Sequence, residues 1–177
     1  MFGDFSIEKF KRTSYPKDFS LKTLDEIKSL KLIPIDADYA NKYDNITRVF
    51  KSLFEKRKRN YPKKIVEDLV ESSHDVIMKI KVYHNRPRPN VLAEKLNINL
   101  PYLHLDSAQT PAFPSGHSAQ AKLVSLVLSD MYPEMQNEFN KLSDHISQSR
   151  IVARVHYKSD KIIGEKLGES LYHHLNK

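Results

Sequence analysis

Apolar residues recur every three or four positions along most of this chain, and no long stretch alternates apolar and polar residues at period two. Residues at that spacing lie on one side of a helix, so each such stripe needs another helix to cover it. Only four of the 177 residues are glycine, which disfavours a turn-rich all-β fold. The sequence therefore predicts an all-α fold, a helical bundle.

The length and the organisation of the chain indicate one domain. A chain of 177 residues is long enough to bury a sizeable apolar core, and a division into two domains would be forced. No internal repeat, low-complexity tract or Gly/Ser linker interrupts it. We expect a single helical domain over residues 1–177, with residues 1–36 as an N-terminal extension that packs on the bundle.

Capping, proline and periodicity signals place the helices. Thr23 to Glu26 looks like a capping box that opens a short helix, which Pro34 limits. Gly164 and Gly168, four apart, would allow a close contact between the last helix and a neighbour. Further helices are expected at 38–59, 62–84, 91–96, 116–131 and 133–157, followed by one that Ser159 caps and that runs to Leu175.

Several protein classes are excluded by what the sequence lacks. Without cysteine there is no disulfide framework, thiolate metal site or cysteine nucleophile. The most apolar run, 119–131, is interrupted by Lys122 and Asp130, so we expect no membrane span. Residues 1–11 carry charges where a secretory signal needs an apolar core. We therefore expect a soluble, cytoplasmic protein.

The formal net charge of +7 favours anionic partners without naming one. Six basic residues cluster in 56–64, around a break between two predicted helices. The simplest interpretation is a solvated basic helix end followed by the first turn of the next helix. The alternative is that the cluster binds an anionic membrane surface or nucleic acid. Because no nucleic-acid motif accompanies the cluster, we do not expect nucleic acid as a partner. A homo-oligomer stays open.

The end of the third long helix carries three permanent cations, Lys81, Arg86 and Arg88, within eight residues. Pro87 and Pro89 hold them close together, so the charges repel one another unless an anion lies among them. The alternative is an ordinary solvated helix end. By itself the cluster favours that alternative.

A loop that leads into the predicted helix 116–131 contains Ser115, Gly116 and His117. Backbone N–H groups at a helix N-terminus can bind an anion, and glycine lets the anion approach the backbone. His117 would then face whatever these N–H groups bind. Alternatively, Ser115 is a plain N-cap beside an exposed histidine.

A third cluster consists of Arg150, His156 and Asp160. Helical spacing places Arg150 and His156 on either shoulder of an apolar stripe, from which both could reach one cleft. An aspartate four residues after a histidine can accept the proton of one ring nitrogen and leave the other as nucleophile or base. A surface His–Asp contact of little consequence is the alternative. No histidine spacing typical of a metal site occurs, so we expect neither metal nor other cofactor.

Taken together, the three clusters combine several cations, the N–H groups of a helix N-terminus and two histidines, one of them beside an aspartate. This combination suits phosphoryl transfer through a covalent phosphohistidine, with no metal needed.

The same residues occur in three segments of defined spacing: Lys81–Pro89 (Lys, six residues, Arg-Pro), Pro114–His117 (Pro-Ser-Gly-His) and Ser149–Asp160 (Ser-Arg, five residues, His, three residues, Asp). The segments resemble the signature of the type 2 phosphatidic acid phosphatase superfamily. That superfamily includes bacterial class A acid phosphatases, membrane lipid phosphatases and vanadium-dependent haloperoxidases. A helical chain without membrane spans resembles the acid phosphatase branch most, although it is shorter than secreted class A enzymes and lacks their signal segment. The first 80 residues lie outside the segments.

The resemblance implies a role for each residue. His156 would attack phosphorus, Asp160 would orient His156, and His117 would protonate the leaving oxygen and later activate water. The phosphoryl oxygens would be held by Lys81, Arg88, Arg150 and the N–H groups of Ser115 and Gly116.

The leading hypothesis is a soluble, metal-independent phosphatase that hydrolyses small phosphate monoesters, with phosphotransferase activity as a further reaction. A vanadium-dependent haloperoxidase, a phospholipid or diphosphate phosphatase, and a non-catalytic phosphate- or phospholipid-binding module are the alternatives. One alignment stays ambiguous, because Lys79, six residues and Arg86-Pro87 fit the first segment too. Tyr83, two residues after Lys81, matches the acid phosphatases only in the alignment that uses Lys81 and Arg88.

Overall fold

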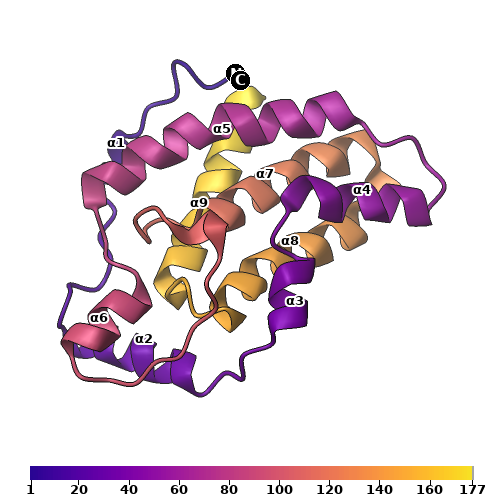
Figure 1. The fold of residues 1–177 in the computed structure, drawn as a ribbon. Coiled ribbons are helices and arrows are strands. Elements are labelled where there is room, and N and C mark those ends of the chain that lie inside the picture. Colours follow the sequence, from indigo (N-terminus) through magenta and orange to yellow (C-terminus); the bar gives the residue numbers. More distant parts are fainter. Residues whose placement is uncertain (177) are drawn as a thin grey trace.

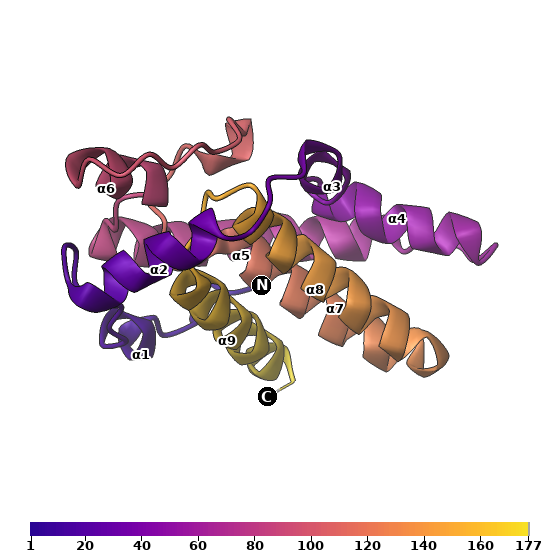
Figure 2. The same ribbon diagram turned by 90° about the horizontal axis from the view of Figure 1, so that it is seen from below.

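Helix α7 (Gly116–Met131) lies at the centre of the fold. Helices α8 (Gln136–Val152) and α9 (Lys158–Leu175) pack against it, and the long helix α5 (Lys63–His84) crosses it on another side, as Figures 1 and 2 show. The computed structural model describes residues 1–176, and within them it contains helices but no strand. The predicted all-α fold is confirmed. No helix in this part of the chain is long and apolar enough to cross a lipid bilayer.

Shorter helices surround this centre. The structure has α1 (Glu8–Lys11), α2 (Leu21–Lys31), α3 (Ala37–Lys42), α4 (Ile46–Lys56) and α6 (Pro89–Lys95), with single 3-10 turns at Asp106–Ala108 and Pro133–Met135. In Figure 2, α2 and α6 lie at one end of the molecule and α4 lies toward the other. The expected short helix at 91–96 is present as α6, shifted by one or two residues.

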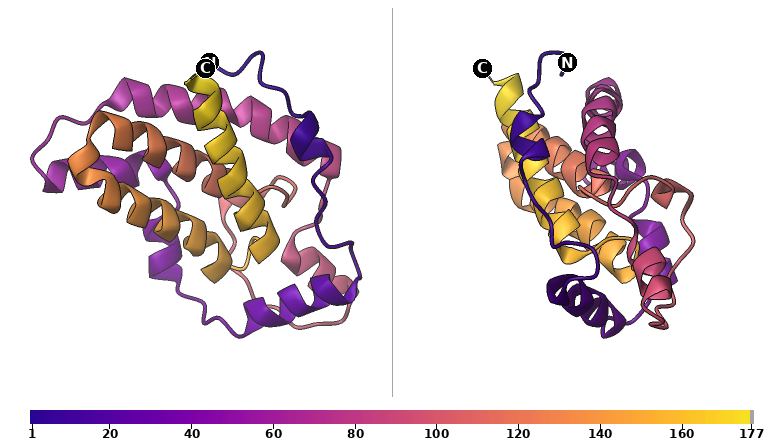
Figure 3. Two further views of the ribbon diagram at one scale, coloured as in Figure 1. Left: turned by 180° about the vertical axis from the view of Figure 1, so that it is seen from behind. Right: turned by 90° about the vertical axis from the view of Figure 1, so that its left-hand side faces the viewer.

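The apolar stripes seen in the sequence meet in one large cluster of buried side chains from α4, α5, α7, α8 and α9. A second cluster joins α2 and α6 to the end of α8, through Ile27, Leu92 and Ile151. The N-terminal residues follow the outside of the bundle, with α2 continuing along its end (Figure 3). Phe2 and Phe10 are buried in the large cluster, and the ring of Phe2 lies 6.3 Å from that of His174 near the C-terminus.

The prediction of a single helix at 38–59 is wrong, because residues 43–45 are not helical and separate α3 from α4. The side chain of Asn45 accepts the N–H of Arg48 and caps α4. Short polar side chains such as those of Asp44 and Asn45 compete for backbone hydrogen bonds and favour caps and turns over helix interiors. This interruption of the helix places Asp44 in contact with His117 and Arg150.

Two other helix ends differ from the prediction. The helix expected to run to residue 157 ends at Val152, and Arg154 adopts a left-handed backbone conformation with φ of 59°. The last helix is capped at Tyr157, not at Ser159, and Asp160 accepts the N–H of Tyr157. His156 therefore lies in a turn between α8 and α9, not on the shoulder of a helix.

At the start of α2 the expected capping box at Thr23 is also wrong. Ser20 is the N-cap, and its side chain accepts the N–H of Thr23. Thr23 is buried, and its hydroxyl donates to the carbonyl oxygens of Pro16 and Lys17 in the preceding loop. A sequence pattern alone did not distinguish these two hydroxyl residues, three apart.

Basic residues of the 56–64 stretch lie at the end of α4 and the start of α5, where several pair with acidic side chains. Arg57 contacts Glu138 and Arg59 contacts Glu134, both near the start of α8, while Lys64 contacts Asp68 one turn along α5. These exposed pairs agree with the interpretation of a solvated helix end and contribute little stability each.

The close helix contact expected at Gly164 and Gly168 is present between α9 and α7. A methyl group added at Gly164 would lie 2.4 Å from the carbonyl oxygen of Ser115, and one at Gly168 would lie 2.4 Å from that of Ala119. Because these atoms belong to the backbone of α7, the helices would have to move apart to make room.

We therefore expect Gly168→Ala to lower the free energy of unfolding by about 1–3 kcal/mol, despite the better helix propensity of alanine. Gly3→Ala is the matched control, since no atom lies within 4 Å of the added methyl group. Urea unfolding of both variants measures the difference. Equal stability of the two variants would show that α7 and α9 are less closely packed than described.

Candidate active site

The predicted site residues meet around one pocket, a cavity of about 230 Å³ beside α5 and the start of α7. Lys81, Arg88, Gly116, His117 and His156 line it. The other three, Ser115, Arg150 and Asp160, are buried and contact lining residues or each other. The chain thus brings together all eight residues singled out in the sequence, although α5, the turn after α8 and the loop before α7 are far apart along it.

His156 forms a buried pair with Asp160 and faces Arg88 on its other side. Nδ1 of His156 lies 3.1 Å from Oδ2 of Asp160, and Nε2 lies 2.9 Å from a guanidinium nitrogen of Arg88. An arginine nitrogen can only donate, so Nε2 accepts and carries a lone pair. The ring proton therefore lies on Nδ1, toward Asp160. This is the tautomer that a nucleophilic Nε2 requires.

Burial and the surrounding charges keep this imidazole neutral. Desolvation, together with the positive charges of Arg88 and Lys81, holds the pKa of His156 well below its usual value. Burial also raises the pKa of Asp160 to about 6, against the opposing effect of the Arg86 guanidinium beside it. Arg86 donates to Oδ1 of Asp160 at 2.6 Å, so the carboxylate is contacted on both oxygens.

Two cations from the first cluster lie on the wall of the pocket. The ammonium group of Lys81 donates to the carbonyl oxygen of Pro111, and the guanidinium of Arg88 donates to those of Thr110 and Val155. Burial, with the neighbouring charge of Arg88, lowers the pKa of Lys81 to about 7. Backbone carbonyls hold both cations in place, but neither forms an ion pair within the part of the chain that is described.

His117, at the start of α7, contacts a residue that the sequence analysis did not identify. Its Nε2 lies 2.8 Å from the carbonyl oxygen of Asp44 and 3.4 Å from a carboxylate oxygen of the same residue. Since these oxygens accept, Nε2 carries the proton in the neutral ring. The pKa of His117 lies below its usual value, because the effects of burial and of the nearby Arg150 outweigh the opposing effect of its hydrogen bonds to Asp44.

Asp44 also connects Arg150 to the site. Its carboxylate accepts from the Arg150 guanidinium and, at 2.7 Å, from the hydroxyl of Ser107. Arg150 in turn donates to the same hydroxyl at 2.9 Å. The hydrogen bond from His117 and these further contacts hold the pKa of the Asp44 carboxyl far below its usual value. The Asp44-Asn45 pair was the available signal, because two such residues in succession favour a turn over a helix interior.

The loop before α7 differs in one respect from what the resemblance implied. The N–H of Ser115 donates to the carbonyl oxygen of Asp160 at 3.0 Å, and its hydroxyl accepts as the N-cap of α7. Helix geometry leaves the N–H groups of Gly116 and His117 without an acceptor inside the helix. Gly116 and His117 both line the pocket, so their N–H groups are the candidates for contact with an anion, whereas that of Ser115 ties the loop to α9.

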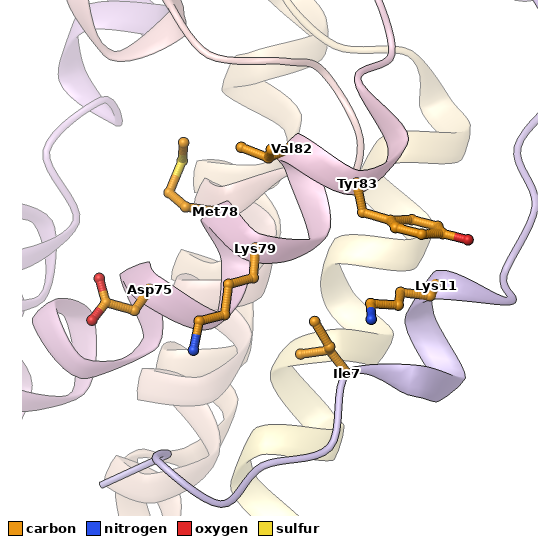
Figure 4. A pocket seen from close by; sticks show the side chains of 7 residues that line it. All are labelled: Ile7, Lys11, Asp75, Met78, Lys79, Val82 and Tyr83. Atoms are coloured by element: carbon orange, nitrogen blue, oxygen red, sulfur yellow. The ribbon is translucent and has the colours of Figure 1, made fainter.

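The ambiguity between Lys79 and Lys81 is resolved by the faces of α5 on which they lie. Lys81 is buried and lines the pocket with His156. Lys79 lines a separate outer groove with Ile7 and Val82 (Figure 4) and is not among the residues that line the site pocket. Arg86 faces Asp160 and Glu26, not the pocket.

Because Lys81 lines the pocket and Lys79 does not, we expect Lys81→Ala to lower kcat/KM. The loss should correspond to about 2–4 kcal/mol of transition-state stabilisation, the scale of one lost charge-stabilising donor. Lys79→Ala removes the same charge from the same helix and should be near neutral. Steady-state kinetics on an aryl phosphate compares the two variants, after circular dichroism has shown that both fold. A larger loss at Lys79 than at Lys81 would mean that the wrong lysine has been assigned.

The fold and this site place the chain among known proteins. The model of the PAP2 superfamily matches residues 70–174, which include all three predicted segments. The chain therefore belongs to the PAP2 superfamily, as the resemblance in its sequence indicated.

Individual relatives are more distant. Non-specific acid phosphatases of Salmonella typhimurium and Salmonella typhi are each 33% identical to this chain over 88 residues. That match covers 50% of this chain but only 35% of each relative. A solved structure, the transmembrane PAP2-type phosphatidylglycerolphosphate phosphatase of Bacillus subtilis, shares the fold with a TM-score of 0.55 at 18% identity. The similarity covers 88% of this chain and 83% of that one.

Proposed function

We propose that this protein is a phosphatase that hydrolyses phosphate monoesters through a phosphohistidine at His156, without a metal ion. The observation that carries the proposal is the orientation of His156, whose Nδ1 faces Asp160 while Nε2 faces Arg88, and both His156 and Arg88 line the pocket. A neutral imidazole in this tautomer is a nucleophile at ordinary pH. The relatedness to non-specific acid phosphatases supports a phosphatase activity.

In the first step Nε2 of His156 attacks phosphorus, and the bond from phosphorus to the ester oxygen breaks. The Nδ1 proton remains shared with Asp160, which stabilises the positive charge that develops on the ring. His117 would enter this step protonated on both ring nitrogens. Its Nε2–H stays on the carbonyl oxygen of Asp44, so Nδ1 delivers its proton to the leaving oxygen and the ring becomes neutral with a lone pair on Nδ1.

In the second step water replaces the histidine. His117 removes a proton from water, the oxygen attacks phosphorus, and the P–N bond breaks to release inorganic phosphate and regenerate neutral His156. Lys81 and Arg88 line the pocket and would bring positive charge to the phosphoryl group, from side chains already fixed by other contacts. Arg150 is buried and paired with Asp44, and it would add a third, partly neutralised charge. Fixed charges of this kind can stabilise the transition state without a divalent ion.

A chelator and vanadate test the proposal together. Hydrolysis of an aryl phosphate should survive chelator and should be inhibited by vanadate, which mimics five-coordinate phosphorus between nucleophile and leaving group. Initial rates at several concentrations of each compound provide the measurement. Activity that is lost in chelator and restored by a divalent ion would overturn the metal-free mechanism.

Phosphotransferase activity, a soluble cytoplasmic protein and a homo-oligomer stay predictions of the sequence. Transfer to an added alcohol, cell fractionation and sedimentation velocity test them in turn. Oxidation of bromide in the presence of vanadate and peroxide would favour the haloperoxidase alternative.

A further inference from the structure

Glu26, on α2, reaches a part of the site that lies far from it in the sequence. One carboxylate oxygen accepts from the Arg86 guanidinium at 3.0 Å and from the Ser159 hydroxyl at 2.9 Å. The other accepts the backbone N–H of Ser159 at 2.8 Å. That N–H belongs to the first turn of α9, where helix geometry leaves it without an acceptor and where the helix dipole favours a negative charge.

Arg86 is the link between Glu26 and the His156–Asp160 pair. Its side chain is 0% exposed, and one nitrogen donates both to Asp160 and, at 2.7 Å, to the Ser159 hydroxyl. The guanidinium carbon lies 4.6 Å from the ring centroid of Tyr15 and 3.8 Å from that of Tyr157, within range of cation–π attraction. Such attraction is less directional than hydrogen bonds, so the position of the guanidinium depends on the hydrogen bonds at its edge, which Glu26 and Asp160 provide.

We propose that Glu26 is a positioning residue for the reaction, holding Arg86 and the first turn of α9 so that Asp160 stays in contact with Nδ1 of His156. Glu26 does not line the pocket, and it lies outside residues 70–174, which match the superfamily. The inference rests on the proposed phosphatase function. If Glu26 has this role, the N-terminal part of the chain, which contains none of the three sequence segments, also contributes to the reaction.

The physical reason is that Asp160 is a buried carboxylate whose charge needs a nearby cation. Burial raises its pKa to about 6, and Arg86 counteracts this rise. Displacing the guanidinium would favour the protonated carboxyl, which no longer fixes the proton of His156 on Nδ1. Glu26 would therefore affect the chemical step and leave phosphate binding largely unchanged.

The test compares Glu26→Gln with Asp25→Asn, which removes an acidic residue exposed on the same helix. We expect Glu26→Gln to lower kcat roughly tenfold, within the range for partners in one hydrogen-bonded network. KM and competitive inhibition by inorganic phosphate should change less than twofold, because Lys81 and Arg88 are untouched. Asp25→Asn should behave like the unmodified protein.

A double-mutant cycle separates positioning from general stability. If Glu26 acts through Asp160, Glu26→Gln should have little further effect on kcat in a protein that already carries Asp160→Asn. An equal tenfold loss in both backgrounds, or no loss in either, would overturn the proposal. An unmodified protein without phosphatase activity would instead refute the proposed function, which keeps the two failures distinguishable.

Should Glu26→Gln fail to fold, Ser159→Ala tests the same connection. This change removes the hydroxyl that accepts from Arg86 and donates to Glu26, and it keeps both charges. We expect a several-fold lower kcat with unchanged inhibition by phosphate, and again no further effect in the Asp160→Asn background. An unchanged kcat would contradict the proposal.

Discussion

His156→Ala is expected to lower the turnover of phosphate monoesters by roughly four orders of magnitude or more, to the level of the background reaction. In the proposed mechanism this side chain supplies the nucleophile, and no other group can take its place while the mechanism stays covalent. The ring is almost fully buried, so the variant must be shown to fold by thermal unfolding before its rate is interpreted. Steady-state assays on an aryl phosphate provide the measurement.

His117→Ala is the informative comparison for that variant. A leaving group of low pKa departs without protonation, so an aryl phosphate should be spared, whereas an alkyl phosphate should lose about 10²–10⁴-fold in rate. If His117→Ala abolishes turnover of both substrates and His156→Ala spares the aryl phosphate, the roles of the two histidines are reversed.

Asp160→Asn is expected to lower kcat by roughly two or more orders of magnitude. An amide that turns its NH2 group toward His156 favours the proton on Nε2, which removes the lone pair facing the pocket. The change also leaves the buried Arg86 with Glu26 as its remaining ion-pair partner among the described residues. Rates and urea unfolding should be measured on the same preparation.

Near-normal activity of Asp160→Asn would reduce Asp160 to a structural residue at the start of α9. Its backbone carbonyl accepts the N–H of Ser115, so that contact survives the substitution and the loop before α7 keeps its support. A strong loss of stability would mean that the Arg86 ion pair contributes mainly to folding.

The sequence predicted well those features that depend on local patterns. The helical class follows from three- and four-residue spacing, and α7 has the predicted bounds, because Ser115 caps one end and Pro133 follows the other closely. The eight candidate site residues were predicted from three segments of fixed internal spacing, and the structure places them around one pocket, while their roles stay predictions. Gly164 and Gly168 indicated a close helix contact because only small residues allow one.

Features that depend on tertiary contacts were missed. Asp44 lies more than 60 residues from His117 and Ser107 in the chain, and nothing local to it indicates those partners. Glu26 is one of two acidic residues in α2, and its contact with Arg86 exists only because α2 packs over the start of α9. The turn at 153–157 was not predicted, because the apolar stripe that indicated a helix continues past the last helical residue, Val152.

Rapid quenching can show directly whether phosphate is transferred to His156. The protein is mixed with a ³²P-labelled phosphate monoester and quenched within one turnover, and the labelled peptide is identified by mass spectrometry. We expect covalent label on His156, formed and lost at rates consistent with kcat, and none in His156→Ala. Label on His117, or full turnover with no labelled histidine at any time, would contradict it.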